Sequence, residues 1–182
     1  MISVFHENTF VLDTDIFDKS LNVCIVASSS FFKLLLNPLY ISLIISSESL
    51  KEKGNDILFN NSLKEEYKVP AEKIQGAILN IIQNANDVVQ NDKIEINLGE
   101  ENNYIELYIA NHGKPIEESV KSEIFNSGFT TKEDGWGIGL YITKKNIEKL
   151  GGEIRLNVSN EEKTEFLIKL PKKQDLLKTE IY

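Results

Sequence analysis

Apolar residues recur at helical spacing between residues 70 and 89, and this is the sharpest pattern in the chain. They fall every three or four positions, at Ile74, Ala77, Ile78, Ile81, Ile82, Ala85, Val88 and Val89. Such a stripe predicts an amphipathic helix packed against a core. A second helix is predicted over residues 138–150, because the glycine pair Gly151-Gly152 follows it and glycine is favoured just past a helix end.

Alternating apolar and polar positions predict strands. The segments with a strand pattern are residues 57–59, 93–98, 104–110, 153–158 and 164–170. The last four are predicted to form two antiparallel hairpins. A short helix is predicted over residues 115–125, and a loop rich in glycine, threonine and charge over residues 126–137. This mixture predicts an α/β fold, a two-layer sandwich in which a mixed, mainly antiparallel sheet packs on helices.

The N-terminal part is apolar but less regular. Helices are expected to begin near Asp13 and at Asn37, and the second would end at Gly54. The stretch of residues 21–47 is interpreted as buried helix. Lys33 and several serines interrupt it, whereas a membrane span needs about 20 consecutive apolar residues.

Composition narrows the classes of function. The 182 residues suffice for one domain with a proper core. Asp and Glu number 28 against 20 Lys and Arg, a net charge of −8, which argues against nucleic acid as a partner. The single cysteine, Cys24, excludes an intrachain disulfide and fits a cytoplasmic location.

Three polar residues share one face of the predicted long helix. Asn80 and Asn84 are four residues apart, and Asp87 follows three residues later. Asparagine is a poor helix former, so two of them on an isoleucine-rich helix suggest a polar cavity. The amide oxygen is a hard ligand suited to Mg²⁺. Taken alone, the pattern fits solvent-facing asparagines equally well.

Glycines at 135, 137 and 139 lie around the start of the second predicted helix. Their backbone N–H groups could approach a ligand closely, and the positive end of a helix dipole favours phosphate. Lys132 would add a point charge. A plain turn would also use such glycines. Further back, Asn111 ends a predicted strand, where it could contact a base edge or simply belong to a strand-to-helix turn.

Together these segments resemble the nucleotide-binding domain shared by sensor histidine kinases, Hsp90-type chaperones and DNA-mismatch-repair ATPases, the Bergerat or GHKL fold. The resemblance covers roughly residues 57–171. Residues 79–87 resemble the N box of that family, 123–132 its F box, 135–142 its second glycine box and 163–171 its closing strand. The flap Phe129-Thr130-Thr131-Lys132 resembles the kinase branch in particular.

The resemblance implies ATP and Mg²⁺ as ligands. Asn84 would hold the metal, and Asn80, one turn earlier, would serve catalysis. A mobile lid would span residues 127–136. The remaining nucleotide contacts implied are Asp87, Asn111, Gly113, Thr130, Thr131, Lys132, Gly135, Gly137, Gly139, Leu140 and Thr164. The implied partner is a histidine-bearing dimerisation domain or a response regulator, in a homodimer.

Two departures qualify this expectation. The first glycine box of the family reads Asp-x-Gly-x-Gly, whereas this chain has Asn111-His112-Gly113-Lys114-Pro115. Loss of the acidic charge is expected to weaken ATP binding by about 1 kcal/mol. A rotated amide would also relax the choice between adenine and guanine.

The second departure concerns the phosphoacceptor. Lys33 stands where the family places a histidine ahead of Asn37-Pro38-Leu39, and the only histidines, His6 and His112, are interpreted as surface or loop residues. A complete self-phosphorylating kinase is therefore not expected from this chain alone.

Three hypotheses stay open: a sensor-kinase catalytic domain with its acceptor elsewhere, a degenerate pseudokinase that binds a partner, and an anti-sigma-type serine kinase. Residues 1–54 would be a shortened dimerisation element or the start of the domain. Residues 55–171 would form the ATP-binding domain, and residues 172–182 a charged tail.

Overall fold

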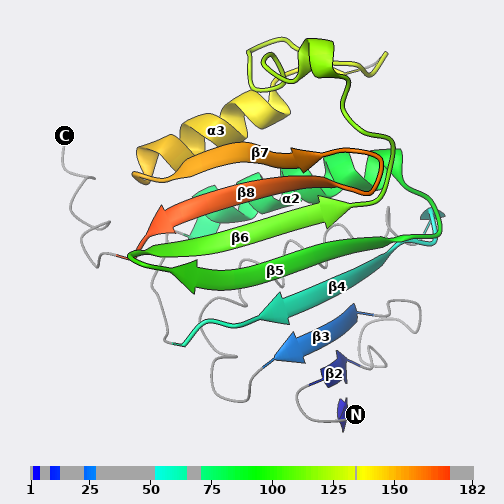
Figure 1. The fold of residues 1–182 in the computed structure, drawn as a ribbon, viewed down its shortest axis with the longest axis vertical. Helices are drawn as coiled ribbons and strands as arrows, with labels where there is room; N and C mark the ends of the chain where they lie inside the picture. Colours follow the sequence, from blue (N-terminus) through cyan, green and yellow to red (C-terminus); the bar gives the residue numbers. More distant parts are fainter. Residues whose placement is uncertain are drawn as a thin grey trace.

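An eight-stranded sheet runs through the computed structural model, with both long helices on one face (Figure 1). The structure describes residues 2–4, 9–12, 23–27, 52–64, 71–133 and 135–172. In spatial order the strands are β1 (Ile2–Val4), β2 (Thr9–Leu12), β3 (Val23–Ala27), β4 (Asp56–Asn61), β5 (Lys93–Glu101), β6 (Tyr104–Asn111), β8 (Thr164–Pro171) and β7 (Glu153–Ser159). Strand β4 pairs in parallel with β3 and β5, and every other pairing is antiparallel. The predicted mixed, mainly antiparallel sheet is confirmed.

The two helices supply the second layer. Helix α2 (Ala71–Val88) buries its isoleucine stripe completely: Ile78, Ile81 and Ile82 are at most 1% exposed. They form one hydrophobic core with the alternate residues Ile94 and Ile96 of β5. Helix α3 (Gly139–Lys149) packs beside α2 and contributes the fully buried Ile147. The periodicities of both helices and of the four C-terminal strands therefore predicted the layers correctly.

The predicted helix over residues 115–125 is wrong except for one short turn. A 3₁₀ helix covers only Glu118–Val120, and a chain of turns follows it. Backbone bonds here join residues three apart, for example from the amide of Glu123 to the carbonyl of Val120 at 2.9 Å. The 3₁₀ helix itself has no buried residue, and the apolar residues of the segment that pack on the core, Ile116, Ile124 and Phe125, lie outside it. No buried apolar stripe therefore holds residues 118–120 as part of an α-helix.

The interpretation of residues 21–47 as buried helix is wrong for Val23–Ala27, which forms strand β3. A short run of β-branched residues is ambiguous by periodicity, and here pairing with β2 and β4 decides in favour of a strand. The other helices predicted before Glu52 lie outside the described residues. The predicted end of the helix that would begin at Asn37 is confirmed, because Gly54 has a φ of +68°. No described helix is long and apolar enough to cross a membrane.

The outer face of the sheet carries a buried charge network. Glu106 of β6 is only 5% exposed; it forms an ion pair with Lys169 and accepts a hydrogen bond of 2.5 Å from the hydroxyl of Tyr108. Burial alone would raise the pKa of Glu106, but the bonds from Lys169 and Tyr108 outweigh it and hold the pKa below its usual value of 4.5. The pKa of Tyr108 is raised to about 12, mainly by the same hydrogen bond to Glu106 and to a smaller extent by burial.

This network predicts a pH-dependent contribution to stability. Because the pKa of Glu106 is depressed by folding, its contribution is fully present above about pH 4.5 and is lost as the pH falls through the lowered value. Urea unfolding of wild type and Glu106→Gln should show the largest difference in free energy near neutral pH and a shrinking difference in acid. A difference that stays constant down to about pH 3 would contradict this assignment.

Candidate functional site

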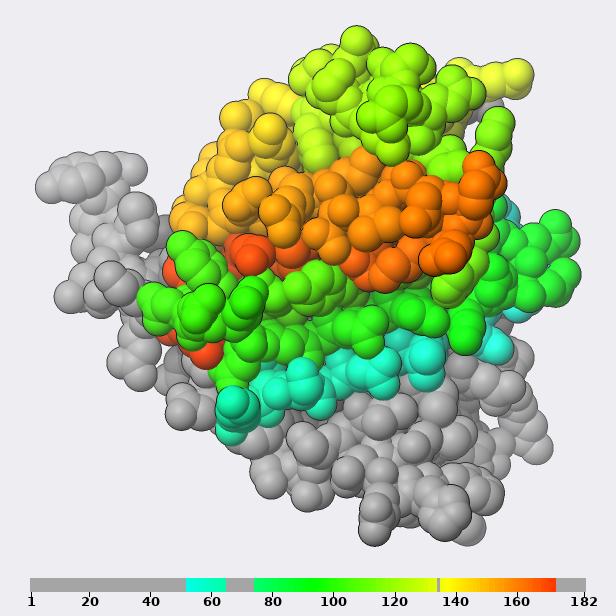
Figure 2. Space-filling view, viewed as in Figure 1, coloured from blue at the N-terminus to red at the C-terminus, as the bar shows by residue number. Residues whose placement is uncertain are grey.

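A cavity of about 230 Å³ opens between α2, the start of α3 and the loop that precedes α3. Its lining is formed by Asn80, Asn84, Phe129, Thr130, Thr131, Lys132, Gly135, Trp136, Gly137, Ile138, Gly139 and Leu140. The structure thus brings together most of the residues singled out in the sequence from the long helix, the flap and the glycine segment. In the space-filling view the segment between β6 and α3 rises above β7 beside α3 (Figure 2).

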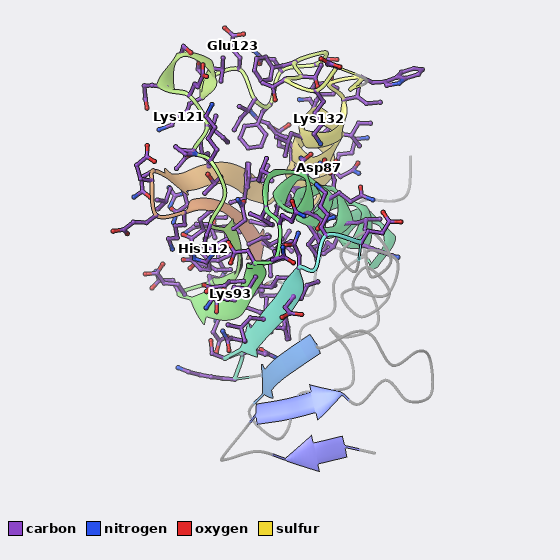
Figure 3. All side chains as sticks on the ribbon, turned by 90° about the vertical axis from the view of Figure 1, so that its right-hand side faces the viewer. Asp87, Lys93, His112, Lys121, Glu123 and Lys132 are labelled. Atoms are coloured by element: carbon purple, nitrogen blue, oxygen red, sulfur yellow. The ribbon has the colours of Figure 1, made fainter. Side chains whose placement is uncertain are left out.

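Lys132 reaches from the loop back to helix α2. Its Nζ donates to Oδ1 of Asn84 at 2.9 Å and forms an ion pair with Asp87 (Figure 3). Both charged side chains are nearly half exposed, 48% for Lys132 and 43% for Asp87, so water screens the pair and it adds little to stability. The geometry of the pair is more informative, because the oxygens of Asn84 and Asp87 together hold the positively charged ammonium group of Lys132.

Asn80 lies where α2 meets the first turn of α3. Its Nδ2 donates to the hydroxyl of Thr143, which is 2% exposed, at 3.1 Å. A Cβ on Gly139 would overlap Oδ1 of Asn80, so any larger residue there would displace the Asn80 side chain from its present position. Thr143 was missed by the sequence analysis. Its position one turn into the second helix was the available signal.

The start of α3 leaves backbone donors available. Its N-cap residue, Ile138, makes no side-chain capping bond, and no acidic residue occupies the first turn. The first N–H groups of a helix lack partners within the helix, and the dipole places partial positive charge there. With Lys132 nearby, this end of the cavity suits an anion such as phosphate.

The loop closes on itself at its base. The amide of Gly128 donates to the carbonyl of Gly137 at 2.9 Å. Gly137 has a φ of +65°, and a Cβ there would lie 2.6 Å from the carbonyl oxygens of Gly128 and Phe129. Trp136 projects from this loop with 83% of its surface exposed. The bond between Gly128 and Gly137 forms a narrow neck that closes a compact flap over the cavity. Its ends lie close to those of the lid expected from the sequence.

Four residues singled out in the sequence do not line this cavity. Asp87 is linked to it through the ion pair with Lys132. Asn111, Gly113 and Thr164 lie apart from it. Asn111 and Thr164 face each other across β6 and β8, and each is 4% exposed. Gly113 lies against the end of α2, where a Cβ would come within 2.7 Å of the carbonyl oxygen of Val88. They form a separate polar cluster beyond Asp87. His112 lies apart from the cavity, with Nε2 4.0 Å from a carboxylate oxygen of Glu95 (Figure 3).

Residues 70–174 match the family described as histidine kinase-, DNA gyrase B- and HSP90-like ATPases. The chain belongs to this family. The match spans α2, the loop that precedes α3 and α3, which together line the cavity, and also strands β5 to β8. The resemblance inferred from the residues is therefore confirmed, and with it the fold.

Sensor kinases are among the relatives of this ATPase domain. A probable C4-dicarboxylate sensor kinase of Halalkalibacterium halodurans is 34% identical over 101 residues, which are 52% of this chain and 19% of that protein. The chain thus spans about a fifth of the length of that curated relative.

Solved structures agree. The catalytic domain of histidine kinase ThkA superposes with a TM-score of 0.66 at 28% identity, covering 79% of this chain and 97% of that one. ThkA in complex with the response regulator TrrA gives a TM-score of 0.65 at 26% identity, covering 77% and 41%. The chain carries an ATP-binding domain of the sensor histidine kinase type.

Proposed function

We propose that this domain binds ATP together with Mg²⁺ and positions the γ-phosphoryl group for transfer to a histidine on another domain or chain. The observation that carries the proposal is the contact of the Lys132 ammonium group with the oxygens of Asn84 and Asp87. Lys132 Nζ lies 2.9 Å from Oδ1 of Asn84, so this oxygen is directed at a position that already holds positive charge. An amide and a carboxylate oxygen are the donor types that Mg²⁺ prefers.

Asn84, with Asp87 beside it, would hold the metal. Bound there, Mg²⁺ would neutralise charge on the phosphate oxygens. The backbone N–H groups at Gly137 and Gly139 and the uncapped start of α3 would bind the terminal phosphates from the other side.

Lys132 would then turn from α2 toward the phosphates. Thr130, Thr131 and Leu140 line the same space and would help to exclude water. The contribution of these residues is positioning and charge compensation rather than covalent chemistry.

Asn80 would act by setting the geometry rather than by touching the phosphates. Its bond to Thr143 fixes the approach of α2 and α3, the two elements that carry the metal ligand and the phosphate cradle. This revises the catalytic role expected for Asn80 to that of a positioning residue.

The phosphoacceptor would come from outside the described residues. His112, the histidine described, lies near Glu95 rather than at the cavity. We propose a histidine-bearing helical hairpin as the acceptor and a response regulator as the next partner. The complex of ThkA with TrrA supports such a partner for this fold. Homodimerisation through that hairpin belongs to the same proposal.

Residues 55–171 are the proposed ATP-binding unit. Strand β3 pairs in parallel with β4 over Val23–Ala27, so part of the first 54 residues extends the same sheet. This pairing favours the start of the domain over a separate dimerisation element for that region.

Replacing Lys132 with glutamine is expected to weaken binding of Mg²⁺-ATP about three- to tenfold. The substitution removes one half-exposed positive charge from the phosphate end, a loss of roughly 1 kcal/mol. Calorimetric titration measures the affinity, and urea unfolding should change little because the ion pair with Asp87 is screened. Lys149→Gln, on the exposed last turn of α3, is the matched control. Equal losses in both variants would contradict a specific role for Lys132.

Phosphoryl transfer is tested in trans. Purified protein, labelled ATP and a histidine-bearing helical hairpin from a sensor kinase should yield an acid-labile phosphohistidine on the hairpin. ATP binding without any transfer would favour the partner-binding pseudokinase. Label on serine would favour the anti-sigma-type kinase.

A further inference from the structure

The buried amide of Asn111 has an unused hydrogen-bond donor. The side chain ends strand β6 and is 4% exposed, yet its Nδ2 has no hydrogen-bond partner among the described residues. The neighbouring hydroxyl of Thr164 lies 3.0 Å from the hydroxyl of Ser159 and is already paired. Buried amide groups in folded proteins nearly always have partners. A ligand group would supply the one that is missing here.

Position along α2 tells which part of a ligand could reach this amide. The start of α3 contacts α2 at Asn80, and the ammonium group of Lys132 lies against Asn84 and Asp87. Beyond them, a Cβ on Gly113 would touch both the carbonyl of Val88 and Nδ2 of Asn111, so Asn111 lies beside the end of the helix. From Asn80 to Val88 the helix rises about 12 Å. A nucleotide with its phosphates at α3 would therefore extend its base toward Asn111.

The chemistry of a carboxamide suits more than one base. It carries one acceptor oxygen and two N–H donors, and a half-turn of the amide exchanges their places. The edge of adenine around position 6 offers an amino donor and a ring-nitrogen acceptor. The same edge of a 6-oxopurine offers a carbonyl acceptor and a ring N–H donor. An amide can pair with either edge, whereas a carboxylate only accepts and would face the 6-oxo oxygen with like charge.

We propose that Asn111 sets the base specificity of this site and that the domain accepts 6-oxopurine nucleoside triphosphates as well as ATP. The inference rests on the proposed nucleotide site. It concerns the base end alone, and the phosphate end described above serves each nucleotide equally.

The test compares ATP, ITP and GTP, each with Mg²⁺, by calorimetric titration of the full chain. ITP differs from ATP only around position 6, and GTP adds a 2-amino group. For wild type, the dissociation constant for ITP should lie within about tenfold of that for ATP. In Asn111→Asp, which keeps the size but only accepts, ATP should bind several-fold more tightly and ITP at least tenfold more weakly.

The matched control is Asn102→Asp, which adds the same charge at an exposed hairpin turn far from the site in sequence. Its ATP-to-ITP ratio should equal that of wild type. Wild-type protein that binds ATP but discriminates against ITP more than 100-fold would overturn the inference and leave the proposed function intact, even if Asn111→Asp failed to fold. So would a change in Asn111→Asp that is the same for ATP and ITP. Failure of all three nucleotides to bind wild type would overturn the proposed nucleotide site itself, and this inference with it.

Discussion

Alanine in place of Asn84 is expected to weaken binding of Mg²⁺-ATP about 100-fold while leaving the fold intact. The side chain contributes the oxygen that holds the Lys132 ammonium at 2.9 Å in the structure, and the proposed metal needs the same oxygen. Losing one ligand of the proposed metal would remove about 2.7 kcal/mol of binding free energy. The gain in ATP affinity on adding Mg²⁺ should therefore largely disappear, while the weak metal-free binding should change little.

The matched control for this variant is Gln83→Ala. Gln83 precedes Asn84 on α2, is exposed and does not line the cavity. Alanine is favourable in a helix, so neither substitution should lower the free energy of unfolding appreciably. Mg²⁺-dependent binding retained in Asn84→Ala, or lost equally in Gln83→Ala, would contradict the assignment of the metal ligand.

Gly137→Ala is expected to reduce ATP affinity at least tenfold by distorting the flap. Gly137 has a φ of +65°, and its added Cβ would lie 2.6 Å from two backbone carbonyl oxygens, those of Gly128 and Phe129. Backbone cannot rotate away as a side chain can, so the neck of the flap must open. The strained conformation adds about 1 kcal/mol or more. Calorimetric titration with ATP and the fluorescence of Trp136, the single tryptophan, would report the loss and the change in the flap.

A glycine-to-alanine substitution at an open position of helix α2 should instead be stabilising. Gly76 lies within α2, and a Cβ there would meet nothing within 4 Å. Gly76→Ala should therefore stabilise the protein by roughly 0.5–1 kcal/mol without changing ATP affinity. If Gly137→Ala behaved like Gly76→Ala, the tight neck of the flap would not be required for binding.

The parts of the fold that the sequence predicted share strong periodicity. The isoleucine stripe of α2 and the alternation in β5 and β6 each bury one face, so the spacing of apolar residues determines the element. Strand β3 was missed because a short, continuously apolar run fits a buried helix as well as a buried strand. The predicted helix over residues 115–125 was wrong for a different reason, because the 3₁₀ helix that forms there buries no side chain.

In the site, too, some features could be predicted from the sequence and others could not. Asn80, Asn84 and the glycines were identifiable because their residue types are unusual for a helix or a plain loop. Their contacts were not readable, since Lys132 reaches Asn84 across 48 positions and Asn80 reaches Thr143 across 63. Such pairings depend on how the helices pack. The unpartnered amide of Asn111 is likewise a property of the folded interior.

The most direct test of the central claim is calorimetric titration of the wild-type protein with ATP in the presence and in the absence of Mg²⁺. The site built from Asn84, Asp87 and the start of α3 predicts saturable binding that Mg²⁺ strengthens at least tenfold, with a parallel change in Trp136 fluorescence. No binding at millimolar ATP, or binding of equal strength with and without the metal, would contradict the account.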